Sequence, residues 1–458
     1  MVPLAELLPA AAANDAETDA CRARLDFGHF LSAGHRLAAE FRPRANLTLR
    51  IVEAVAPGRL GTGFRWLLAS SWTTNLGDGI ALAAGPLLVA SQTDQAFLVA
   101  LAAMLQWAAP LVFGLYAGAL TDRLNRKAIV VTVDAVRVVI LVLFATMVVT
   151  GTVSIGLVLG AMFLLGTAEL FADNASATLL PMIVHRDDLA IGNSRLQAGF
   201  VTVNQLVGPP LGALLFAAGM AWPFVAQAVL VLFGIMLVAR VALPAHGRDR
   251  DASTRLRTDI AEGFRWTMHN AAVRTLVLTI FTFNITFGAA WSVLVLYATR
   301  RLGLGEVGFG LITTMIALGG VVGTLSYGWL TRRVTLGNLM RIGLIIETFI
   351  HLALAMAMDP RIAMPVFFVF GAHAFVWGTT SVTVRQRAVP MELQGRVSSV
   401  HLVGVFGGLV VGSAIGGALA QQWGVAAPFW FAFAGSALFV VLIWRQLTHI
   451  AHTDETAA

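Results

Sequence analysis

The chain contains twelve long apolar stretches, and these constrain its fold more than any other feature. An α-helix needs about 20 apolar residues to cross the ~30 Å hydrocarbon core of a bilayer. Backbone polar groups at membrane depth must be satisfied within a helix or a closed barrel, and stretches of this length are helical. The predicted spans are residues 66–90, 96–121, 128–150, 153–176, 196–218, 221–243, 273–298, 306–330, 338–357, 361–384, 397–420 and 424–447.

Composition supports a membrane-embedded chain over a water-soluble one. Of 458 residues, 57% are apolar and 12% are charged, and the mean hydropathy is +0.78. A water-soluble core cannot bury so much apolar surface. The single Cys21 cannot form an intramolecular disulfide, and the sequence has no paired-Cys metal motif, so we expect no metal and no cofactor.

The basic residues predict the orientation of the chain. If both termini are cytoplasmic, 28 of the 31 Lys and Arg residues fall on the cytoplasmic side, and only Arg300, Arg301 and Arg361 fall on the other. Cytoplasmic segments near helix ends carry such an excess of positive charge. The net charge of +6 is therefore explained by topology, and nucleic-acid binding is not needed to account for it.

A charged loop and an internal repeat divide the chain into halves. Residues 118–127, Gly-Ala-Leu-Thr-Asp-Arg-Leu-Asn-Arg-Lys, join two apolar stretches by a tight turn. The Gly-x-x-x-Asp-Arg of residues 118–123 recurs as Gly-x-x-x-Arg-Arg at 328–333, 210 residues later. The Pro-Met pair at 181–182 recurs at 390–391, after 209 residues. Because two pairs share nearly one offset, we predict an internal repeat of two halves.

The same motifs resemble one large class of transporters. The loop Gly118, Asp122, Arg123, Arg126 and Lys127 resembles the signature loop of the major facilitator superfamily. Together with further motifs the chain resembles, over about residues 66 to 445, the branch that holds macrolide efflux proteins and enterobactin exporters. These further motifs are Ser71 to Asp78, Asp134 to Arg137, Gly208-Pro209-Pro210-Leu211-Gly212, Arg385 to Pro390 and Gly395-Arg396-Val397.

The helix-5 element Gly208, Pro209, Pro210 and Gly212 resembles the antiporter motif of exporters, and we expect it to bend the helix and permit close packing. Two positions depart from the family pattern. Asn125 replaces the usual Gly of the loop, which we attribute to the ease with which Asn adopts left-handed backbone angles. Asn204 replaces the first Gly of the helix-5 motif.

The resemblance implies an all-α membrane protein with twelve transmembrane helices in two pseudo-symmetric six-helix bundles around a central cavity. The predicted parts are a mostly disordered cytoplasmic extension (1–62), an N-terminal bundle (63–243), a cytoplasmic linker (244–272), a C-terminal bundle (273–447) and a cytoplasmic tail (448–458). We expect a monomer in the inner membrane of a bacterium.

An ionisable side chain at membrane depth is the first place to seek coupling chemistry, because its burial is costly. Asp78 lies near the middle of the first span, three residues after Asn75. We interpret it as a proton-coupling or substrate-binding residue, with a structural hydrogen bond to a neighbouring helix as the alternative. His373, in the tenth span, is a second candidate, since histidine titrates near neutral pH; a neutral structural histidine is the alternative there.

The candidate substrate pocket combines aromatic and amide side chains, as an amphipathic ligand requires. Its principal members are Trp107, Asn284, Trp291 and Trp377, with Trp72, Gln106, Phe281 and Phe287 as further candidates. Glu347 and His351 lie four residues apart on one helical face, and we interpret them as a structural pair.

A second group of charges is interpreted as the inner gate. Asp134, Arg137, Glu169 and Asp173 all fall in the cytoplasmic halves of the third and fourth spans. We expect Asp122 to dock near Gly395 and Arg396 at the start of the eleventh span when the cytoplasmic side closes. Simple helix anchoring is the alternative for this network.

These observations predict a secondary transporter that uses proton entry to export an amphipathic small molecule, such as a macrolide drug or a siderophore. The alternatives are uptake or lipid flipping by the same fold, or a membrane sensor that does not transport. An enzyme is not expected, because His351, His373 and His401 are scattered over different spans and form no catalytic group.

Overall fold

The computed structural model describes residue 53 and residues 55–243, 256–390 and 393–444. The chain divides into two compact units, residues 1–61 and 62–458, and the helices discussed below lie in the second. The described residues contain helices and no β-strand. Most of the predicted N-terminal extension, part of the predicted linker and the C-terminal tail lie outside the described residues.

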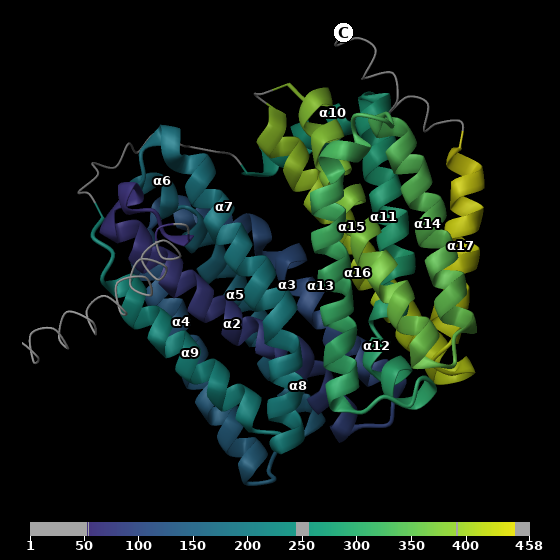
Figure 1. Cartoon of the computed structure of the whole chain (residues 1–458), viewed down its shortest axis with the longest axis horizontal. Coiled ribbons are helices and arrows are strands. Elements are labelled where there is room, and N and C mark those ends of the chain that lie inside the picture. The colour runs from purple at the N-terminus through teal and green to yellow at the C-terminus, as the bar shows by residue number, and fades with distance from the viewer. Residues whose placement is uncertain (1–52, 54, 244–255, 391–392, 445–458) are drawn as a thin grey trace, which may run out of the picture. The chain divides into compact units, whose positions relative to one another are not determined.

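The predicted all-α membrane fold is confirmed. Ten helical segments in the described part of the chain are long and apolar enough to cross a membrane. These ten segments correspond to the second to eleventh predicted spans, and α2 and the shorter apolar helix α17 correspond to the first and the twelfth. Figure 1 shows the helices. The N-terminal half contains, after the short 3-10 turn η1 (Gly58–Leu60), α2 (Gly61–Gln92), α3 (Ala96–Arg123), α4 (Arg126–Val149), α5 (Ile155–Ala177), α6 (Leu180–Ile183), η2 (Arg186–Asp188), α7 (Leu189–Gly199), η3 (Phe200–Val207), α8 (Gly208–Ala218) and α9 (Trp222–Ala239).

The C-terminal half follows a helix in the linker, α10 (Leu256–His269). Its helices are α11 (Ala271–Trp291), α12 (Leu294–Leu296), η4 (Tyr297–Arg301), α13 (Glu306–Leu330), α14 (Leu336–Met356), α15 (Pro360–Ala388), α16 (Gln394–Trp423) and α17 (Ala427–Ile443). The fifth span is therefore not one regular helix: it runs through α7, a π-helical segment η3 and α8.

Helix packing repeats between the halves. In the N-terminal half α4 packs on α5 and α9, and α3 packs on α5; in the C-terminal half α14 packs on α15 and α17, and α13 packs on α15. The halves meet through α3 with α16 and through α8 with α13. Helices α3 and α13 are the second spans of their halves, and α8 and α16 are the fifth spans. Each contact therefore joins a second span to a fifth span of the other half, which is the pseudo-symmetry that the repeat predicts.

Glycines allow the closest helix contacts in both halves. A Cβ atom on Gly208 of α8 would lie 2.6 Å from the Cα of Gly79 in α2. In the other half, a Cβ on Gly416 of α16 would lie 2.6 Å from the Cα of Ala289 in α11. Only a residue without a side chain permits backbones to approach this closely.

The described contacts between the halves cluster away from the charged loop. The backbone N–H of Phe97 donates to Gln421 Oε1 at 3.4 Å, and the rings of Trp107 and Phe406 stack with centroids 6.3 Å apart. On the side of the charged loop, a Cβ on Gly118 or Gly395 would meet no atom within 4 Å. The described contacts therefore join the halves near Phe97 and Trp107, and at Gly118 and Gly395 no atom lies within contact of an added Cβ.

Candidate functional site

A buried network of charges links three membrane helices of the N-terminal half. Arg137 of α4 forms an ion pair with Asp78 of α2 and donates to Asp134 Oδ1 at 3.1 Å. The three side chains are 2% to 7% exposed. Each charge of this network depends on its partners, since a buried charge that loses all of them is uncompensated.

Sequence reasoning did not find the fourth member of this network. Gln227 of α9 donates through Nε2 to Asp78 Oδ1 at 3.1 Å, and its own Oε1 is buried without a hydrogen-bond partner. The available signal was a lone amide in the strongly apolar segment Trp222–Ala239. Such a residue at membrane depth is expected to bond to another helix.

The structure joins two groups of residues that the sequence had assigned to separate roles. Asp78, the coupling candidate, contacts Arg137 directly, and Arg137 belongs to the predicted gating group. Glu169 and Asp173 of α5 are close enough to interact electrostatically with the same guanidinium. Four carboxylates thus surround one arginine, and a proton or another cation can compensate the excess of negative charge.

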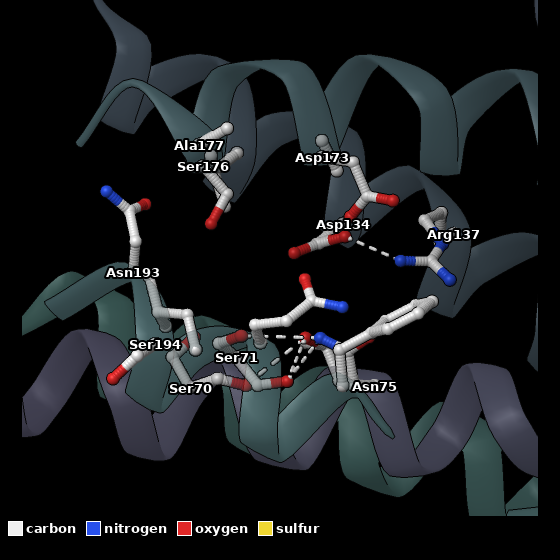
Figure 2. Close-up of a pocket in the computed structure, with 16 residues that line it drawn as sticks. Ser70, Ser71, Asn75, Asp134, Arg137, Asp173, Ser176, Ala177, Asn193 and Ser194 are labelled. Atoms are coloured by element: carbon white, nitrogen blue, oxygen red, sulfur yellow. Dashed lines mark hydrogen bonds and ion pairs between the residues drawn. The ribbon is translucent and has the colours of Figure 1, made fainter. Parts of the chain in front are cut away.

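A cavity of about 550 Å³ adjoins this network within the N-terminal half. Figure 2 shows Asp134 and Asp173 along one wall, with Asn75 and Ser71 across from them. Asn75 Nδ2 donates to the carbonyl oxygen of Ser71 at 2.8 Å, which fixes the amide in the wall. The lining comes from α2, α4, α5, α7 and η3 and comprises Ser70, Ser71, Thr74, Asn75, Val130, Asp134, Arg137, Ala172, Asp173, Ser176, Ala177, Asn193, Ser194, Leu196, Gln197 and Phe200.

The charged loop after α3 is held to the end of α9. Lys127 Nζ donates to the carbonyl oxygens of Ala239 at 2.6 Å and Val241 at 2.8 Å. These carbonyls lie at the C-terminus of α9, where a cation is favoured by the helix dipole. The side chains of Asp122 and Arg123 lie outside the described set, and Arg126 is the first residue of α4.

The expectation for Asn125 is wrong. Its φ is −68° and its ψ is 110°, which is extended backbone and not the left-handed region. Its side chain instead accepts a hydrogen bond from the backbone N–H of Ala128 at 3.1 Å and caps α4. Asn is therefore suited to this position because it is a good N-cap residue.

The predicted docking region at the start of α16 is occupied by the linker helix. Arg396 Nη1 lies 2.8 Å from Glu262 Oε2 of α10. A Cβ on Gly263 would lie 2.6 Å from the carbonyl oxygen of Arg396. Trp266 of the same helix packs against the apolar cluster that includes Val273 and Val397. The described part of the linker is thus a helix fixed to the C-terminal half.

The helix-5 motif packs in two directions. Gly208 and Gly212 lie against α2. On the other side, a Cβ on Gly310 of α13 would lie 3.1 Å from the carbonyl oxygen of Pro209 and 3.1 Å from the Cα of Pro210. The motif therefore lies between the first span and a helix of the opposite half. Asn204, in the preceding π-helical segment, donates to the carbonyl oxygen of Asn75 at 3.2 Å.

The aromatic pocket candidates are dispersed, and none of them lines the cavity. Trp291 packs on Phe287 and Phe370, with ring centroids 4.5 Å and 4.4 Å apart. Trp107 lies at the interface between the halves. Asn284 uses its Nδ2 to bond the carbonyl oxygen of Ile280 at 2.7 Å. The Nε1 of Trp377 is buried and has no hydrogen-bond partner among the described residues.

His373 pairs with a residue that we had assigned elsewhere. Its Nε2 lies 3.5 Å from Glu347 Oε2, between α15 and α14. The side chains of His373 and Glu347 are 5% and 12% exposed. His351, the expected partner of Glu347, is fully buried, and neither of its ring nitrogens has a hydrogen-bond partner.

With this geometry established, similarity to known proteins identifies the class. Residues 53–458 match the family described as transmembrane secretion effector. The chain belongs to the transmembrane secretion effector family of the major facilitator superfamily. Members of this superfamily are transporters, so the protein is a membrane transporter and not an enzyme.

Two curated relatives of this secretion effector are exporters by name. The multidrug efflux pump Tap of Mycolicibacterium fortuitum is 27% identical over 388 residues, which cover 79% of this chain and 90% of Tap. The enterobactin exporter EntS of Escherichia coli strain K12 is 23% identical over 417 residues, which cover 86% of this chain and 94% of EntS. Both relatives belong to the branch that the motifs indicated.

Solved structures resemble this secretion effector in fold. A bacterial homologue of the iron transporter ferroportin in an inward-facing state aligns with a TM-score of 0.68 at 16% identity, covering 84% of this chain and 98% of that one. The nucleoside transporter NupG aligns with a TM-score of 0.65 at 13% identity, covering 85% and 99%. At these identities the likeness concerns the fold alone.

Proposed function

We propose that this transporter is a proton-coupled exporter of an amphipathic small molecule in the bacterial inner membrane. The observation that carries the proposal is the buried network of Asp78, Arg137 and Asp134 beside a cavity of about 550 Å³. The exporter names of Tap and EntS support the direction of transport and suggest a drug such as a macrolide, or a siderophore, as cargo.

The network is suited to exchange protons for cargo because its acidic groups outnumber its cations. A proton on any one carboxylate reduces the excess negative charge around Arg137, and so does a cationic group of the cargo in the cavity. Binding of one therefore opposes binding of the other. This competition is what antiport requires.

The membrane potential supplies enough energy for such an exchange. One charge that moves through 100 mV contributes about 2.3 kcal/mol, which supports a roughly 50-fold gradient of a neutral cargo per proton. Access to the cavity alternates as the two halves rock against each other. The chain works as a monomer with both termini in the cytoplasm, as the distribution of basic residues favours.

Everted membrane vesicles test direction and coupling together. We expect energised vesicles that contain the wild-type chain to accumulate a labelled macrolide or enterobactin, and to lose it when a protonophore is added. The Asp78→Asn variant should lose at least about 90% of this accumulation at equal expression, since its side chain cannot exchange a proton. Asp187→Asn is the matched control, because Asp187 is an exposed acid whose partner, His185 at 3.3 Å, is also exposed and lies in the same loop.

The outcomes separate the candidate functions. Accumulation that Asp78→Asn leaves undiminished would remove this residue from the coupling mechanism. Uptake by right-side-out vesicles in place of accumulation by everted ones would favour an importer. Movement of a labelled lipid between leaflets, without release of a soluble compound, would favour a flippase.

A further inference from the structure

A second buried pair of ionisable groups lies in the C-terminal half, remote in sequence from the Asp78 network. Glu347 and His373 face each other at 3.5 Å across α14 and α15. The pair is an ion pair only when the imidazole carries a proton. If that proton leaves, Glu347 is a largely buried carboxylate with no other hydrogen bond or ion pair among the described residues, which is unfavourable.

The internal repeat relates this pair to the N-terminal network. Adding the 210-residue offset of the charged loops to Arg137 gives Glu347, so the two residues hold equivalent positions on the third helix of each half. Each carries a buried charge that meets a partner on a neighbouring helix of its own half. The cation of the N-terminal pair is permanent, because arginine stays protonated in proteins. The cation of the C-terminal pair exists only with a bound proton.

The pair packs against the backbone of α14 at Gly343. Rings of both His373 and Trp377 lie over Gly343, where a Cβ would be 3.1 Å from His373 Cε1 and 2.6 Å from Trp377 Cδ1. Besides the pair itself, His351 is the titratable group nearest to Glu347, one helical turn along α14, and it has no hydrogen bond with which to stabilise a charge.

The other helices packed on α14 and α15 bring no ionisable group to the middle of the membrane. Helix α17 has no titratable side chain between Ala427 and Ile443. On α11, α13, α14 and α15 the remaining titratable side chains lie toward the helix ends: Arg274, Glu306, Tyr327, Arg341, Arg361, Arg385 and Arg387. The charge of His373 therefore depends on Glu347.

We infer that Glu347 and His373 form a second proton-binding site, in which a proton on the imidazole makes an ion pair with the carboxylate. This deepens the proposed function, since each half then carries its own ionic pair and only the C-terminal one is made and broken by a proton.

Nuclear magnetic resonance of ¹⁵N-histidine in the full-length protein in lipid nanodiscs tests the inference without any substrate. The chain has ten histidines, and the resonance lost in His373→Asn identifies the ring of interest. We expect a larger fraction of doubly protonated ring in the wild type than in Glu347→Gln when both are compared at one pH, because Glu347 faces the ring at 3.5 Å. In Glu347→Gln the ratio of protonated to neutral ring should fall at least about tenfold, as expected for the loss of ~1.4 kcal/mol of charge interaction.

Two further variants keep the test decisive. Glu306→Gln should leave the His373 resonance unchanged, because Glu306 is an acid in the first turn of α13, away from the pair. Gly343→Ala should also neutralise His373, since its added methyl group displaces the ring from Glu347; it replaces Glu347→Gln if that variant does not fold. A His373 ring whose protonated fraction is the same in the wild type and in both variants would overturn the inference. Because the readout is a protonation state, such a result would leave the vesicle test of export standing.

Discussion

Arg137 interacts with four carboxylates of the N-terminal half, and no sequence pattern indicated that Asp78 is one of them. It is fully enclosed, and it meets Asp78 from one helix and Asp134 from its own. Its Nε has no hydrogen-bond partner among the described residues. Four charge partners compensate in part for that missing bond, since a charged hydrogen bond is stronger than a neutral one.

Replacing this arginine should therefore cost more stability than replacing one of its partners. We expect Arg137→Gln to lower the free energy of unfolding by about 3–5 kcal/mol, because Asp78 and Asp134 lose their shared cation. Asp78→Asn should be milder, since Arg137 keeps Asp134. Thermal unfolding in detergent measures both. Equal melting temperatures for the two variants would show that the network does not depend on the arginine.

The sequence could not predict which charges meet. Asp78 and Arg137 are 59 residues apart, and nothing in the local pattern of either helix specifies the rotation that makes them face each other. Burial of both could be inferred, because charges within apolar spans are costly. We assigned Asp78 to coupling and Arg137 to gating because they lie on different helices. In the structure both belong to one network.

At the scale of helices, hydrophobic length predicted the spans well and their internal form poorly. The fifth span begins earlier than residue 196 and contains the π-helical segment Phe200–Val207, which apolar length does not reveal. The linker was taken as an Arg-rich connection, yet Leu256–His269 forms a helix on α16. Apolar residues recur along this segment at helical spacing, so the sequence could have predicted the helix.

The glycine contacts between α2 and α8 give a prediction at this scale. A methyl group on Gly212 would meet the backbone of Ile80, with the carbonyl carbon 2.9 Å away. Gly212→Ala should therefore destabilise the N-terminal half by about 1–3 kcal/mol, as overpacking does. Gly395→Ala is the matched control and should change stability by less than about 1 kcal/mol, because no atom lies within 4 Å of its added Cβ. Similar melting temperatures for the two variants would contradict the close approach.

At the scale of the molecule, the repeated helix contacts define two halves that can move as bodies. The α3–α16 and α8–α13 contacts are symmetry-equivalent, so one rocking motion affects both in the same way. In this structure the halves are in contact at Phe97 and Gln421, and no atom lies within 4 Å of a Cβ added to Gly118 or Gly395 on the loop side. The proposed alternating access requires the contact at Phe97 to open while the loop side closes.

A cross-link across that contact tests alternating access most directly. In a chain with Cys21 replaced by Ser, the double variant Phe97→Cys, Gln421→Cys is joined by a short thiol reagent that reduction removes. The control joins Thr286→Cys and Ser436→Cys within the C-terminal half, where the wild-type hydroxyls lie 3.1 Å apart. We predict that the cross-link between the halves stops pH-driven accumulation of a labelled macrolide or enterobactin in everted vesicles, that reduction restores it, and that the control pair transports in both conditions. The account would be contradicted if the protein cross-linked between the halves transports as fast as the same protein after the cross-link is reduced.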